Sequence, residues 1–156
     1  MNEHSPEEPE VVEAVLGASR VLVAVAARSL AEVAEEVTLP QYRALIVLAS
    51  KGPQRVVSLA EALGVTPPTA TRMCDRLVRK GLVRRRTPRD DRREVRLSLT
   101  AAGRELVTAV TERRRAEIAE ILSGISPDDQ VAMVELFGRL ARAAGEVPDR
   151  DWQLEL

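Results

Sequence analysis

Apolar residues recur every three or four positions along most of this 156-residue chain, a spacing typical of amphipathic helices. The first such stretch runs from about residue 11 to residue 37. After Thr38-Leu39-Pro40 a second stretch follows to about residue 50, where Lys51-Gly52-Pro53 interrupts it. The pattern therefore predicts two consecutive helices in the first third of the chain.

Two shorter helices are predicted next, joined by a tight turn. Ser58 and Glu61 have the spacing of a capping box, which starts a helix that ends at Gly64. Thr66-Pro67 then starts another helix, to residue 80, because proline is favoured in the first turn. So short a turn between two helices is typical of a helix-turn-helix.

Beyond Gly81 the apolar residues alternate, which is typical of strands. Leu82-Val83 begins one short strand, and Val95, Leu97 and Leu99 alternate along a second, with a polar turn at residues 87–93 between them. Two more helices follow, from Thr100 to about residue 123 and from Ser126 to about residue 145. The order predicts a mainly α fold with one small β-hairpin.

Composition excludes several classes of function. Aromatic residues make up only 2% of the chain, too few for the stacking platforms that bind RNA or single strands. One cysteine (Cys74) and one histidine (His4) exclude an internal disulfide and a multi-histidine metal site. The acids are scattered over helix surfaces, which disfavours an enzyme that uses paired carboxylates. We therefore expect no enzymatic activity, no cofactor and no metal.

Charge is strongly segregated along the chain. Residues 66–93 contain ten basic and three acidic residues, a net charge of +7, whereas the rest of the chain carries −8. An electropositive face on an acidic body is therefore expected, and its natural partner is a polyanion. Nucleic acid is the first candidate.

The helix predicted at residues 66–80 has two distinct faces. Its core face holds Ala70, Met73, Cys74, Leu77 and Val78, and its outer face holds Thr69, Arg72, Arg76 and Arg79, flanked by Thr71 and Asp75. Arginine binds guanine through two hydrogen bonds, and threonine contacts a thymine methyl group or a phosphate. An ordinary solvated face explains this helix equally well when it is considered alone.

The hairpin favours the DNA-binding interpretation. Residues 84–86 and 89–93 add a cluster of arginines, Arg89 among them, that repels itself unless phosphates supply a counter-charge. Arg93, two residues after Asp91, is suited to the narrow minor groove. Helix and hairpin together therefore predict a double-stranded DNA partner.

Two segments resemble a known family. The first is Thr71-Arg72-Met73-Cys74-Asp75-Arg76-Leu77-Val78-Arg79-Lys80-Gly81-Leu82-Val83, and the second is Asp91-Arg92-Arg93-Glu94-Val95-Arg96-Leu97-Ser98-Leu99-Thr100. The first resembles the recognition-helix segment of the multiple antibiotic resistance regulator (MarR) family. The second resembles the family's wing, Asp-x-Arg followed by an alternating strand that ends in Leu-Thr. Glu94 departs from the family pattern, which has small residues or glycine there.

The resemblance implies a winged helix-turn-helix with long N- and C-terminal dimerisation helices. It implies recognition-helix contacts to DNA from Thr66, Pro68, Thr69, Thr71, Arg72 and Arg76. The wing arginine corresponds to Arg93 and its supporting acid to Asp91. Tyr42 and Arg43 lie near where relatives bind small aromatic effectors, although packing and solvent contact explain them as well. The implied function is a homodimeric repressor of a pseudo-palindromic operator, released by a small aromatic or anionic effector.

Residues outside this pattern are expected to be structural. Cys74 is expected to fill the core, and the run Arg113-Arg114-Arg115 to pair with glutamates of neighbouring helices. His4 and Trp152 lie in tails and are given no role.

The predicted organisation is a single domain with two short extensions. We expect a disordered acidic lead (1–10), a domain (11–145) and a C-terminal tail (146–156). Within the domain, the DNA-binding lobe spans about 39–100, and the dimerisation region spans about 11–37 and 101–145. The acidic N-terminus and the short apolar runs predict a cytoplasmic protein that is not inserted in a membrane. The alternative is a winged-helix protein-interaction module that does not bind DNA.

Overall fold

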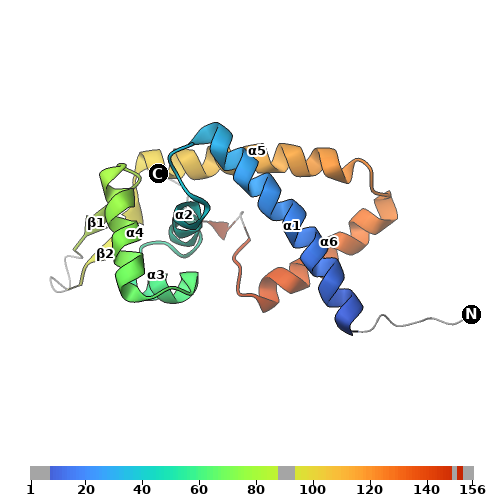
Figure 1. Cartoon of the computed structure of the whole chain (residues 1–156), viewed down its shortest axis with the longest axis horizontal. Coiled ribbons are helices and arrows are strands. Elements are labelled where there is room, and N and C mark those ends of the chain that lie inside the picture. Colours follow the sequence, from blue (N-terminus) through green and yellow to red (C-terminus); the bar gives the residue numbers. More distant parts are fainter. Residues whose placement is uncertain (1–7, 88–93, 149–150, 153–156) are drawn as a thin grey trace, which may run out of the picture.

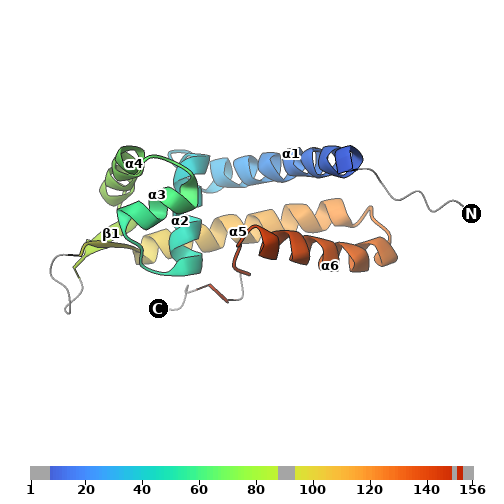
Figure 2. The ribbon, with the colours of Figure 1, turned by 90° about the horizontal axis from the view of Figure 1, so that it is seen from below.

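The computed structural model describes residues 8–87, 94–148 and 151–152. The elements in chain order are α1 (Glu8–Val33), α2 (Leu39–Lys51), α3 (Val56–Leu63), α4 (Pro67–Arg79), β1 (Val83–Arg86), β2 (Arg96–Leu99), α5 (Ala101–Leu122) and α6 (Pro127–Ala143). Figure 1 shows α2, α3, α4 and the hairpin gathered in one lobe, from which α1 and α5 extend toward α6. α1 and α5 are in contact, and Figure 1 shows α1 slanting away from α5 toward α6, whereas Figure 2 shows the two helices in separate layers.

The expected fold class is confirmed. β1 and β2 pair antiparallel, with Val83 opposite Leu99 and Arg85 opposite Leu97, and the hairpin follows directly on α3 and α4. The arrangement is a winged helix-turn-helix joined to three longer helices.

The core of the lobe is drawn from every element around it. Leu45, Leu59, Leu77 and Leu97, from α2, α3, α4 and β2, are each 0% exposed. Val107 of α5 is buried in the same cluster. Because each element buries one apolar face against the others, α4 is held by its inner side and its outer side is left to solvent.

α1 begins earlier than the sequence predicted. The prediction that residues 1–10 are a disordered lead is wrong for residues 8–10, which are helical, and the helix ends at Val33 rather than near residue 37. Pro9 is tolerated in the first turn, where its missing N–H would have no helical partner, and Glu8 and Glu10 favour the positive end of the helix dipole.

α3 does not start at Ser58, so the predicted capping box is wrong. The helix begins at Val56 with Arg55 at the N-cap, and no side chain caps it. A backbone bridge sets this start, because Gln54 N donates to Leu97 O at 3.0 Å and Leu97 N donates to Gln54 O at 2.7 Å. The second strand is also shorter than predicted, since Val95 lies outside β2 and is exposed.

Tight backbone contacts fix the lobe to α5. Thr100 caps α5 as predicted, and its hydroxyl also donates to Gly81 O at 2.6 Å. A Cβ on Gly103 would lie 2.1 Å from Leu82 O, so only glycine allows this approach. The first turn of α5 therefore lies against the chain that leaves α4.

None of the described helices combines the length and the apolar character that crossing a membrane requires.

Candidate nucleic-acid interface

α4 presents the residues that the sequence assigned to DNA on its solvent side. Ala70, Cys74 and Leu77 are 0% exposed and anchor the inner side. The outer side carries the predicted residues, half-buried Thr69 and exposed Thr66, Pro68, Thr71, Arg72 and Arg76. Thr66 has an extended backbone and Pro67 starts the helix, as predicted.

Hydrogen bonds position the first turn of this face. Thr66 Oγ1 lies 3.0 Å from Thr69 Oγ1, and Arg72 Nη2 donates to Thr69 Oγ1 at 3.4 Å. Thr71 Oγ1 donates to Pro67 O at 2.9 Å. Arg72 is thus aligned along the helix by a neutral hydroxyl, and most of its five N–H donors are left for another partner.

Five arginines of α4 and β1 have no ion pair with any described residue. They are Arg72, Arg76, Arg79, Arg84 and Arg86. Two other cations of the region are used internally, since Arg85 pairs with Asp75 of α4 and Lys80 Nζ donates to Glu36 O at 2.7 Å. The lobe therefore carries several cations whose charge the described part of the protein does not neutralise.

The hairpin is held to α4 by the pair between Arg85 and Asp75. Glu94, the departure from the family pattern, lies 3.3 Å from Arg55 and 2.8 Å from Arg96, so it links the start of α3 to β2. Neither set of ion pairs was predicted from the sequence, because each joins segments that come together only when the hairpin folds. Arg89, Asp91 and Arg93 lie outside the described residues.

Cys74 fills the core, as predicted. The thiol is 0% exposed, and burial raises its pKa to about 11. The group is therefore neutral near pH 7 and shielded from solvent, which are the properties of an unreactive thiol.

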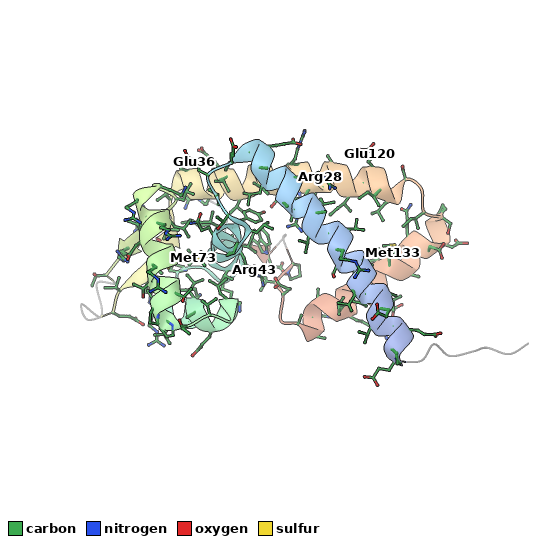
Figure 3. All side chains as sticks on the ribbon, viewed as in Figure 1. Arg28, Glu36, Arg43, Met73, Glu120 and Met133 are labelled. Carbon is green, nitrogen blue, oxygen red and sulfur yellow. The ribbon has the colours of Figure 1, made fainter. Side chains whose placement is uncertain are left out.

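A second site lies where α1, α2, α5 and α6 meet the C-terminal segment. A cavity of about 880 Å³ is lined by both predicted effector residues, Tyr42 and Arg43. Tyr42 is buried, and its hydroxyl lies 3.5 Å from Thr111 Oγ1 of α5. Arg43 extends from α2 toward the segment after α6, where it pairs with Glu146 (Figure 3).

Other residues of this cavity were not predicted from the sequence. Arg113 pairs with Glu32 of α1, as expected of that run, whereas Arg115 pairs with Glu112 within α5 itself. Arg114 lines the cavity, and its buried Nε has no hydrogen-bond partner among the described residues. Trp152, assigned to a tail without a role, is half-buried against the core and lines the same cavity. The tail prediction is wrong for Trp152, because the indole finds apolar cover there.

Comparisons with known proteins agree with this geometry. The MarR family model matches residues 37–95, from the end of the α1–α2 connection into the wing. The crystal structure of RV1404 from Mycobacterium tuberculosis has a TM-score of 0.84 and 41% identity, over 92% of this chain and 99% of that chain. The uncharacterised HTH-type transcriptional regulator YfiV of Bacillus subtilis (strain 168) is 29% identical over 69% of this chain and 68% of YfiV. NadR, solved with 4-hydroxyphenylacetate, is 25% identical over 90% of this chain and 96% of NadR, with a TM-score of 0.64.

The helix-turn-helix, the basic wing and these relatives define a DNA-binding winged-helix transcription regulator. The chain belongs to the MarR family.

The tie between Asp75 and Arg85 generates a prediction. Asp75→Asn removes a negative charge beside the exposed arginines of α4, so charge alone would tighten binding to every duplex. If the pair positions the wing relative to α4, the ratio of specific to non-specific affinity should instead fall about two- to fivefold, the range expected of an exposed ion pair. The measurement is the dissociation constant on a cognate and a scrambled duplex at one salt concentration.

Glu61→Gln is the matched control, because it removes a carboxylate of α3 that has no ion pair with a described residue. Equal tightening on both duplexes by Asp75→Asn would show that the pair does not position the wing.

Proposed function

We propose that this regulator is a homodimeric repressor that binds a pseudo-palindromic operator and is released by a small aromatic or anionic effector. The observation that carries the proposal is the exposed face of α4, where threonines lie beside arginines that have no ion pair with a described residue. In addition, the terminal helices leave large apolar faces exposed. Such a face is suited to the major groove, and such helices are suited to a second copy of the chain.

Base recognition is assigned to Arg72 and Arg76, with Thr66, Pro68, Thr69 and Thr71 along the start of the helix. The exposed guanidinium of Arg72 has the donors for a bidentate contact to guanine. The wing arginines Arg89 and Arg93, with Asp91 holding Arg93, are proposed to contact the adjacent minor groove and backbone.

Dimerisation is assigned to α1, α5 and α6, with the lobe of about 39–100 between them. α6 has no buried residue, and its Val131 and Val134 are 72% and 78% exposed. A groove between α1 and α6 is lined by Val15, Leu22, Leu136, Phe137 and Leu140, among others. Exposed apolar area on this scale is unfavourable in water. A second copy related by a two-fold axis would bury the apolar faces of both chains at once.

The effector site is assigned to the cavity beside Tyr42 and Arg43. Four arginines line it, and among the described residues Glu146 is its only carboxylate, so an anionic group is favoured there. Apolar residues such as Ile46 and Ile118 supply a surface for an aromatic ring. NadR, a relative of similar fold, was solved with 4-hydroxyphenylacetate, a ligand of this chemistry.

Arg72→Ala tests base recognition. On a duplex that the parent protein selects from random sequence, the variant should lose about 1–3 kcal/mol of binding free energy and accept other bases at one position in each half-site. The measurement is affinity across a set of single-base operator variants. A loss that is equal on all duplexes would make Arg72 a phosphate contact, and no loss on any duplex would show that Arg72 does not contact DNA. Failure of the parent protein to select any duplex would favour the protein-interaction alternative.

Val134→Glu tests the dimer. A glutamate at this exposed position of α6 would place a charge in the proposed interface and weaken dimerisation by on the order of 3 kcal/mol, more than a hundredfold. Sedimentation without DNA measures the shift. Val57→Glu is the control, because it adds the same charge at an exposed valine of α3 and should leave the dimer intact. An equally stable dimer with Val134→Glu would contradict the assignment of α6.

A further inference from the structure

The chain after α6 turns back into the molecule. Gly145 has a positive φ of 73°, and the next residue, Glu146, donates its backbone N–H to Ala141 O at 3.0 Å. Trp152 donates from Nε1 to Val147 O at 2.9 Å and packs against the core cluster. We call residues 146–148 and 151–152 the strap; Figures 1 and 2 both show the chain after α6 leading toward α2.

The strap supplies one wall of the cavity that Tyr42 and Arg43 line. Glu146, Val147 and Trp152 face it together with Arg114 and Arg142. The Glu146 carboxylate accepts hydrogen bonds from both terminal nitrogens of Arg43, with Nη1 to Oε2 at 3.2 Å. This is the two-point geometry in which arginine binds any carboxylate, including that of a ligand.

We propose that the strap is a built-in competitor for the effector. The Glu146 carboxylate binds the guanidinium of Arg43, where the carboxylate of an aromatic acid would bind. Trp152 covers the apolar wall of the cavity, where the ring of that acid would lie. Binding of such an acid therefore exchanges one carboxylate for another on Arg43 and displaces the strap. This inference rests on the proposed effector-controlled function, and it adds that the chain's own C-terminal segment lowers the affinity for the effector.

The contact is weak enough to be exchanged. The side chains of Arg43 and Glu146 are 46% and 40% exposed, and ion pairs of that exposure contribute little net stability. A ligand carboxylate in the same position forms an equivalent pair, so the exchange costs little electrostatic energy. The ring of the ligand then replaces the apolar cover that Trp152 provided.

The strap also joins the two functional parts. It continues from α6, a dimerisation helix, and its Glu146 holds α2, which is buried in the lobe from Ala44 to Ala49. Displacement would release this link between α6 and the lobe that carries α4. A change at the cavity would thereby reach the lobe that carries α4, because the contact is either made or broken.

The single tryptophan makes the strap directly observable. Trp152 is the only tryptophan of the chain, so its emission and its quenching by acrylamide report on the strap alone. Glu146→Gln should shift this emission to the red and increase quenching. Glu135→Gln is the control, because it removes a carboxylate of α6 that pairs with Arg139 away from the cavity, and it should behave as the parent. Unchanged emission in Glu146→Gln would contradict the role of the Arg43 pair.

Ligand exchange is tested with phenylacetate, an aromatic acid, and its neutral isostere phenylacetamide. Phenylacetate should shift the Trp152 emission of the parent to the red and bind Glu146→Gln about two- to fivefold more tightly than the parent. Phenylacetamide has no carboxylate to exchange on Arg43, so it should bind both proteins more weakly than phenylacetate does and shift the emission of the parent less. Phenylacetate binding with unchanged emission and equal affinity for both would overturn the strap as a competitor.

Operator binding separates this inference from the function on which it rests. If phenylacetate displaces the strap but leaves operator affinity unchanged, the strap stands and effector-controlled release fails. If it releases the operator without moving Trp152, effector control stands and the strap fails. Binding to neither protein would contradict both.

Discussion

The arginines that extend from α4 and β1 into solvent are the constraint on which the rest of the molecule depends. Several like charges lie close together, and the described part of the lobe offers Asp75 to Arg85 but no acid to Arg72, Arg76 or Arg84. Such a cluster is electrostatically unfavourable in the free protein, and phosphates relieve it on binding. The buried leucines of the lobe hold the helices that carry these arginines in a fixed arrangement.

The orientation of this face relative to the long helices depends on a few close contacts. Gly103 lies against Leu82 O, and the Thr100 hydroxyl donates to Gly81 O, so α5 is tied to the end of α4. On the other side, Lys80 Nζ donates to Glu36 O in the connection between α1 and α2. These contacts join the long helices to α4 at its C-terminal end. The strap adds a further contact at α2, the partly exposed ion pair between Arg43 and Glu146.

The bounds of α4 and the position of β2 were predicted correctly because each depends on residues close together in the sequence. Thr66-Pro67 starts α4 and Gly81 ends it, and the alternation around Leu97 defines β2. The exposed face of α4 followed from helical spacing alone. The division into a DNA-binding lobe and a dimerisation region stays a prediction, since one copy of the chain does not test it.

Tertiary contacts account for what the sequence did not predict. The start of α3 is set by the bridge from Gln54 to Leu97, more than forty residues away, which outweighs the capping signal at Ser58. The same holds for Arg114, whose direction into the cavity depends on the packing of α5, and for Trp152, whose segment has no helical or strand pattern. Such pairings become visible only when the elements are placed in space.

Selection of bound sequences from randomised duplex DNA tests the central claim most directly, that a two-fold dimer presents two α4 faces to one operator. The account predicts enrichment of an inverted repeat whose half-site centres lie about 10–10.5 base pairs apart, one turn of the duplex. Enrichment of a single half-site, or of no sequence at all, would contradict it.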